Sequence, residues 1–385
     1  MDYELADKHR ELASSFGDFC RNEILPGAAR LDEADPGETA GLMRENLAKL
    51  GRAGYFRHLL ADDMIGRCVA GEELAKNCGA TFLSAMSSGT SFGAPVSIFG
   101  SDAQRERYLP ALALGNLAGC LAYSEEAAGS DLSGIGTRAT RRGDGWVLDG
   151  GKDLVTNAPL ADAFLVLAWT DQTGGLERGL TFFLLDRDTD GLTIGPALST
   201  MGLRGAPTAG INLADCRVFA GAILGGETGR GYGQLMKTLE HIRLAISILS
   251  LGLGVASMEE STRHAKARRA FGKPIGLFEG VGAKLAIMFT LNDLCRMMAW
   301  KTAWTMEQGN QEATILSSCA KIFASESARE IAHLAMQVQG GHGYLKGRPS
   351  ERIYRDARFA ELAFGASELL RGAIAKDTLD RFKEG

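Results

Sequence analysis

The C-terminal part of the chain carries four long helical patterns, which constrain its fold more than any other feature. Apolar residues recur at helical spacing over Tyr232–Lys266, Ile275–Gly309, Gln311–Gln339 and Ser350–Phe382. Long helices that follow one another through short connections pack side by side in alternating directions. The pattern therefore predicts an up-and-down four-helix bundle over residues 231–385.

The N-terminal part of the chain, residues 1–118, also shows helical spacing. A serine, Ser101, stands where it can cap one of these helices, and Pro110 is expected to end the same helix. The expected helices cover Thr39–Leu50, Met64–Cys78 and Asp102–Leu109.

The middle part of the chain, residues 119–230, changes to a period of two. Short runs rich in β-branched and aromatic residues alternate there with turns such as Asp190-Gly191, which predicts a compact antiparallel β-barrel. The predicted fold is therefore mainly α, with a central β-barrel domain between an N-terminal helical domain and the bundle. The expected strands lie in Gly145–Leu148, Ala163–Trp169, Leu180–Leu185, Leu192–Ile194 and Ile211–Leu213.

Composition and charge argue against several classes of protein. The formal net charge is −5 and no long basic run is present, so no nucleic-acid partner is expected. The seven cysteines form no CxxC pair and the six histidines no HExxH spacing, so no metal site is predicted. The most apolar run, Leu244–Met258, is too short for a membrane span and fits a buried helix. We expect a cytoplasmic protein without a membrane partner.

Two glycine-containing motifs adjoin the predicted bundle helices. The stretch Arg268–Ile275 reads RRAFGKPI, and a guanidinium fork suits phosphate oxygens better than any other side chain. Gly340 and Gly341 form a pair near the start of the last helical pattern. Without a Cβ they allow a flat or charged ligand to approach the backbone, and a helix N-terminus favours phosphate.

Together with the three-part order, these motifs resemble the acyl-CoA dehydrogenase family of flavoproteins over nearly the whole chain. Family members read R-x-x-F-G-K-P-I, Q-x-x-G-G and R-x-x-R-D-A at matching places. The resemblance implies an FAD cofactor, with Arg268 at its diphosphate, often across a subunit interface, and Phe271 near its adenine. It therefore also implies a homodimer or homotetramer. The residues implied at the diphosphate and adenine end are Gln337, Gly340 and Gly341.

The resemblance extends to the middle part of the chain. Residues Tyr123–Asp131 are similar to the family's T-E-P-G-A-G-S-D stretch, which lies against the flavin and the thioester. Residues Gly150–Asn157 are similar to G-x-K-x-W-I-T-N, where the Thr contacts the reactive edge of the flavin and the Trp covers its ring. Here Leu154 replaces that Trp. The residues implied at the flavin are Tyr123, Ser124, Gly129, Ser130 and Thr156, and Ser130 is also implied at the substrate.

The position of the family's catalytic base is occupied by an unusual residue. Most members remove the proton next to the thioester with a Glu in a Y-E-G-T turn, and Phe364 stands at that place here. A phenyl ring accepts no proton. Other members supply the Glu from the first bundle helix, where the matching residue is Ile242. The resemblance therefore implies an acyl-thioester enzyme that lacks the usual base.

Other groups are candidates for that base. Glu240 aligns with an acidic residue that usually binds the pantetheine arm, and it does not share a helix face with Ile242. It is therefore a poor replacement, and Glu361 and His241 are further candidates. The residues implied at the substrate are Ser130, Glu240, Arg243 and Phe364.

Several functions remain open. An FAD-dependent oxidoreductase that acts on a thioester of coenzyme A or of an acyl carrier protein is favoured, because the Phe364–Glu368 turn and the Phe-Gly-Lys-Pro loop resemble the dehydrogenase branch. The enzyme could also run as a reductase. The alternatives are a flavin-dependent monooxygenase of the same fold and a non-catalytic flavin-binding scaffold.

Overall fold

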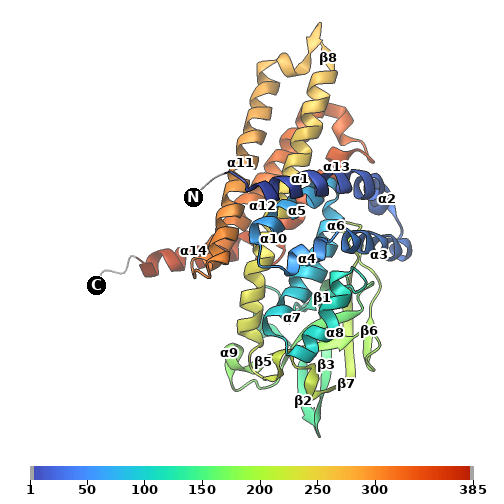
Figure 1. The fold of residues 1–385 in the computed structure, drawn as a ribbon, viewed down its shortest axis with the longest axis vertical. Coiled ribbons are helices and arrows are strands. Elements are labelled where there is room, and N and C mark those ends of the chain that lie inside the picture. Colours follow the sequence, from blue (N-terminus) through green and yellow to red (C-terminus); the bar gives the residue numbers. More distant parts are fainter. Residues whose placement is uncertain (1–3, 382–385) are drawn as a thin grey trace.

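A computed structural model describes residues 4–381 and shows a helical part, a β sheet and a long helical bundle along one axis (Figure 1). Between α6 (Gly79–Met86) and α7 (Ala94–Phe99) the chain forms a π-helical segment, Ser87–Gly93, which is completely buried. The N-terminal helices are α1 (Asp7–Phe19), α2 (Ala28–Glu33), α3 (Pro36–Arg52), α4 (Tyr55–Leu60), α5 (Met64–Asn77), α6 (Gly79–Met86), α7 (Ala94–Phe99) and α8 (Asp102–Ala113).

Helix α8 confirms its predicted start and corrects its predicted end. Ser101 accepts a hydrogen bond from the Gln104 backbone N–H, and the Gln104 side chain accepts one from the Ser101 N–H, which is a capping box. The expectation that Pro110 ends the helix is wrong, because α8 continues to Ala113. One further turn buries Leu112 completely, and this burial outweighs the hydrogen bond that proline removes.

The middle part forms one seven-stranded sheet in the order β1-β4-β2-β3-β7-β6, with β5 on the other edge of β4. Strands β1 and β2 both run parallel to β4, so the expectation of an antiparallel β domain is wrong for these two pairings. The sheet is a mixed half-barrel. The strands are β1 (Gly119–Ala122), β2 (Arg138–Arg142), β3 (Gly145–Thr156), β4 (Ala163–Trp169), β5 (Leu180–Asp186), β6 (Leu192–Ile194) and β7 (Thr208–Phe219).

Helix α10 (Gly231–Ala267) is the centre of the bundle. By length and composition it is apolar enough to cross a membrane, but 72% of its most apolar window is buried inside the protein. The prediction of a buried helix over Leu244–Met258 is therefore confirmed. A short hairpin, β8 (Arg269–Ala270) and β9 (Lys273–Pro274), joins α10 to α11. The bundle helices are α10 (Gly231–Ala267), α11 (Glu279–Glu307), α12 (Ala313–Gln339), α13 (Pro349–Leu362) and α14 (Ser367–Arg381).

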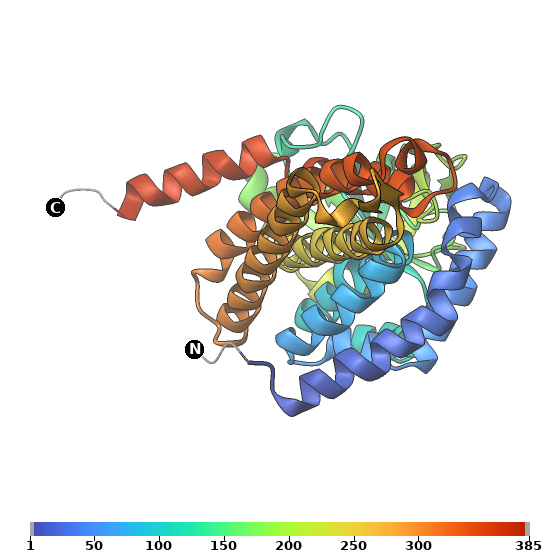
Figure 2. The same cartoon turned by 90° about the horizontal axis from the view of Figure 1, so that it is seen from above.

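The fourth helical pattern is broken, contrary to the expectation of one helix over Ser350–Phe382; Phe382 itself lies outside the described residues. Phe364 and Gly365 have φ angles of 54° and 107°, which no right-handed helix accommodates. The chain therefore turns between α13 and α14, and α14 extends away from the other helices in both views (Figures 1 and 2).

Candidate functional site

A buried ion pair shapes the loop that follows β1. The Lys152 ammonium on β3 lies 2.6 Å from a Glu125 oxygen, and the Lys152 side chain is fully buried. Glu125 also accepts hydrogen bonds from both Gly136 N–H and Thr137 N–H. Burial lowers the pKa of Lys152 to about 8, although the Glu125 carboxylate opposes that change. The pair fixes the loop that carries Ser124, Gly129 and Ser130.

The end of β3 is bound to the buried helix α6 and the π-helical segment after it. The Asn157 amide donates to the Ser84 carbonyl at 2.8 Å and to the Ser88 hydroxyl at 3.1 Å. The Ser87 hydroxyl donates to the Thr156 carbonyl at 3.1 Å. Thr156 is thereby held in place with its side chain half-buried, and the nearby Leu154 is 64% exposed.

A cationic cluster lies beside the turn between α13 and α14. The fully buried Lys321 donates to the carbonyls of Glu361 and Gly365, on either side of Phe364, at 3.1 and 2.7 Å. These bonds satisfy carbonyls that the break in the helix leaves unpaired. Burial, followed by repulsion from Arg243, lowers the pKa of Lys321 to about 8. Sequence reasoning missed Lys321, because nothing in its local pattern distinguishes it from a surface lysine.

Arg243 belongs to the same cluster and has an unsatisfied group. Its buried Nε has no hydrogen-bond partner within residues 4–381, and its Nη1 donates to the Ser318 hydroxyl at 3.5 Å. Burial lowers its pKa, while the charges of Glu240 and Tyr123 oppose this effect. A buried donor without a partner is costly. Arg243 is therefore available to bind a ligand atom.

The carboxylates named as alternative bases already accept hydrogen bonds or form ion pairs. In Glu240 one oxygen lies 2.7 Å from the Lys237 ammonium and the other accepts from the Thr314 hydroxyl at 2.6 Å. In Glu361 the oxygens pair with Arg329 at 2.8 Å and Arg358 at 3.2 Å. Neither carboxylate can therefore take a proton from a substrate without giving up one of these partners.

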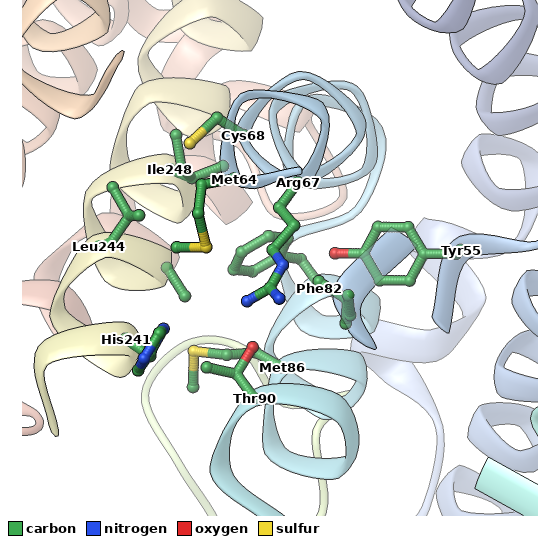
Figure 3. A pocket seen from close by; sticks show the side chains of 12 residues that line it. Tyr55, Met64, Arg67, Cys68, Phe82, Met86, Thr90, His241, Leu244 and Ile248 are labelled. Carbon is green, nitrogen blue, oxygen red and sulfur yellow. The ribbon is translucent and has the colours of Figure 1, made fainter. Parts of the chain in front are cut away.

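His241, the remaining candidate, lies on a different side of α10 from Arg243. It lines a cavity together with Arg67 of α5 (Figure 3). Burial lowers its pKa to about 4, with the positive charge of Arg67 as the second cause. A histidine with that pKa is neutral near pH 7 and is a weak base.

The residues predicted at the diphosphate and adenine end lie far from this cluster. Arg268 caps the end of α10 and Phe271 lies in the turn between β8 and β9, and both are exposed. Strand β8 lies at the opposite end of the longest axis from the sheet (Figure 1). The ring of His342, next to Gly341, lies 6.3 Å from that of His264 on α10, so the paired glycines share this end. Within one chain, the predicted FAD residues therefore form two separated groups.

The order of helices, sheet and bundle is shared with known proteins. Three domains of one family match consecutive parts of the chain: the acyl-CoA dehydrogenase N-terminal domain over residues 6–116, the middle domain over 120–216 and the C-terminal domain over 229–379. The chain belongs to the acyl-CoA dehydrogenase family. It is accordingly an oxidoreductase of the acyl-CoA dehydrogenase type.

Relatives in the acyl-CoA dehydrogenase family match nearly the whole chain. A probable acyl-CoA dehydrogenase of Bacillus subtilis is 34% identical over 98% of this chain and 100% of its own length. A 3-(aryl)acrylate reductase of Clostridium sporogenes is 33% identical, over 97% and 99%. Among solved structures, butyryl-CoA dehydrogenase from Megasphaera elsdenii has a TM-score of 0.92 at 29% identity, covering 98% and 100%. The prolyl acyl carrier protein oxidase AnaB has a TM-score of 0.89 at 28% identity, covering 97% and 100%.

The cofactor of this member of the family is FAD, and the residues present fit it. Leu154 and Phe271 are large apolar side chains that are 64% and 96% exposed, as expected of groups that cover a flat ring. A Cβ at Gly340 or Gly341 would meet no atom within 4 Å. The backbone at these glycines is therefore open to close approach by a ligand.

Proposed function

We propose that this enzyme acts on an acyl thioester, of coenzyme A or of an acyl carrier protein, without the glutamate that most of its relatives use as base. Phe364 stands in place of that glutamate. The main support for a missing base is that the neighbouring carboxylates of Glu240 and Glu361 are already bound to cations or a hydroxyl. The catalytic carboxylate is thus replaced by an apolar ring beside a cationic cluster.

The cationic cluster offers a way to move the α-proton without a strong base. When FAD is bound, it supplies the acceptor for the hydride from the β-carbon. Loss of the α-proton to a solvent water places negative charge on the thioester oxygen, and fixed donors or cations near that charge stabilise it. Arg243, with its unpartnered Nε, and Lys321 are the groups proposed for this role. Phe364 shapes the wall of the pocket beside the reacting carbons.

The first experiment follows the flavin absorbance of purified holoenzyme under anaerobic conditions while acyl-CoA and acyl-carrier thioesters are added. We expect bleaching with at least one class of thioester, because hydride transfer reduces the flavin. Bound flavin that no thioester bleaches would contradict thioester oxidation and favour a reductase or an oxygenase. A colourless protein that takes up no FAD would favour a scaffold.

We also propose that the enzyme is a homodimer or homotetramer whose FAD sites are shared between subunits. The separation of β8, which Arg268 directly precedes, from β3, which Thr156 ends, supports this, because one chain presents only part of the site in each place (Figure 1). An exposed apolar stripe on α11 supplies a surface for a second copy. The stripe consists of Ile287, Leu294, Met297 and Trp304, which are 43–47% exposed.

The Arg268→Met variant is expected to bind FAD about tenfold to a hundredfold more weakly, because it loses a charge-assisted hydrogen bond to phosphate. Flavin content after dialysis measures this, with Lys266→Met, an exposed neighbour on α10, as control. Co-expression of Arg268→Met with Thr156→Trp chains should restore part of the FAD binding. Absence of any restoration would contradict a site shared between subunits.

A further inference from the structure

Two adjoining cavities meet beside α10, on a different face of that helix from Ile242. The inner cavity, about 30 Å³, lies between α4, α5, α6 and α10 and has mostly apolar walls (Figure 3). The outer cavity, about 380 Å³, extends toward α7 and the end of α11. Both are lined by Leu59, Met64, Arg67 and His241. Arg67 and His241 therefore stand where a narrow apolar space meets a wider polar one.

The charge of Arg67 has no ion-pair partner in the described chain. Its Nε donates to the Ala61 carbonyl at 3.0 Å and its Nη2 bonds to the same oxygen, which leaves Nη1 without a partner among residues 4–381. Two of the three nearby carboxylates are already used, and the third, Asp62, lines the outer cavity but not the inner one. Asp63 binds Lys8 and His9, and Glu307 accepts hydrogen bonds from the backbone at the start of α5. A half-buried guanidinium with an unused donor favours an anion.

Other unpartnered polar groups face the same space. The buried His241 Nδ1 has no hydrogen-bond partner in the part of the chain that the structure describes. The Tyr55 hydroxyl points toward Arg67 across the cavity, and Thr90 lies below it (Figure 3). None of the described residues that line the inner cavity is an Asp or Glu. A guanidinium and two hydroxyls, all able to donate, match a ligand group that accepts several hydrogen bonds.

We propose that this space binds the far end of the acyl group, and that this end carries a carboxylate which pairs with Arg67. The inference rests on the thioester function proposed above and specifies its substrate class. Apolar side chains such as Phe82, Met86 and Leu244 suit the methylene chain, and the flexible methionines can widen the space. The Arg67 and His241 donors bind the carboxylate where the chain ends.

The position of the cavity fits this role. Phe82 and Met86 line the cavity from α6, while Ser84 and Ser87, from the same stretch of chain, bond to the end of β3 at Asn157 and Thr156. The cavity and the end of β3 are thus separated by about one helix diameter, roughly 10 Å. An acyl chain of several carbons is required to reach from one to the other.

The test compares two thioesters of equal length, octanoyl-CoA and its counterpart with a terminal carboxylate, in binding to the holoenzyme by anaerobic titration calorimetry. We expect the carboxylate-ended thioester to bind at least about tenfold more tightly. Arg67→Met should abolish this preference, since losing one partner of a buried charged pair raises the dissociation constant by roughly thirtyfold or more. Arg57→Met removes an exposed charge from the adjacent α4 and should leave the preference unchanged.

The outcomes separate the two proposals. Binding of both thioesters with equal affinity, in the wild type and in Arg67→Met alike, would overturn the inference and leave the thioester function standing. If neither binds to flavin-loaded protein, the thioester function itself fails. Free octanedioate that binds without displacing octanoyl-CoA would overturn the assignment to the acyl group, since the carboxylate would then belong to a separate ligand. His241→Phe repeats the test if Arg67→Met unfolds.

Discussion

Replacing Phe364 with Glu is expected to accelerate removal of the α-proton of an acyl thioester by about a hundredfold to ten-thousandfold. A positioned general base typically contributes a factor of this size. The wild-type ring supplies no base, and the carboxylates of Glu240 and Glu361 are already bound to other groups. A gain in this range would therefore show that residue 364 faces the α-carbon and that only a proton-accepting group is missing there.

The turn that carries Phe364 makes the substitution feasible. Lys321 bonds to carbonyls on both sides of it, so the backbone should keep its path when the side chain changes. The φ angle of 54° is uncommon but open to residues without a branched β-carbon. The positive charges of Lys321 and Arg243 would keep an introduced carboxylate ionised and ready to accept a proton.

Exchange of the α-protons with deuterated water, followed by NMR of the thioester, measures this step. Phe364→Gln is the matched control, because it has the size of Glu and cannot act as a base at neutral pH. Equal exchange in Phe364→Glu and Phe364→Gln would mean that any change comes from the smaller side chain and not from a base. Exchange in the wild type as fast as in Phe364→Glu would contradict the proposal that the usual base is missing.

Replacing Lys152 with Met is expected to lower the free energy of unfolding by about 3–5 kcal/mol, since it leaves the Glu125 carboxylate buried without its cation. Urea unfolding measures the loss. The Glu125→Gln substitution in the same chain should recover part of it, because the amide oxygen can still accept from the Thr137 N–H. A Lys152→Met variant as stable as the wild type would show that the Lys152–Glu125 ion pair contributes little to the free energy of unfolding.

The pH dependence gives a second readout for Lys152. Burial lowers its pKa from 10.5 to about 8. Between these two values the unfolded chain holds a proton that the folded protein has released, so the free energy of unfolding gains a component that rises with pH. The Lys152→Met variant should lack this component. A parallel pH profile in both proteins would contradict the assigned cause.

Local sequence patterns predicted the elements well and the connections between distant elements poorly. The capping box at Ser101 is visible because both partners lie within one turn. Lys152 and Glu125 each stand in a stretch that resembles the family, but they are 27 positions apart, so a local pattern does not show that they pair.

Arg67 gives no sequence signal, because its surroundings depend on how α10 places His241 beside α5. The strand β1 pairs in parallel with β4 across a long connection, which a period-two pattern cannot specify.

The exposed β8–β9 hairpin affects how the fraction of active enzyme depends on the protein concentration. One chain carries its predicted nucleotide-end residues at one end of its longest axis and its predicted ring-facing residues on the sheet side. If neighbours complete each other's sites, holoenzyme formation is linked to self-association and follows mass action. Diluting the protein would then release flavin and activity together, and FAD would in turn hold the subunits together.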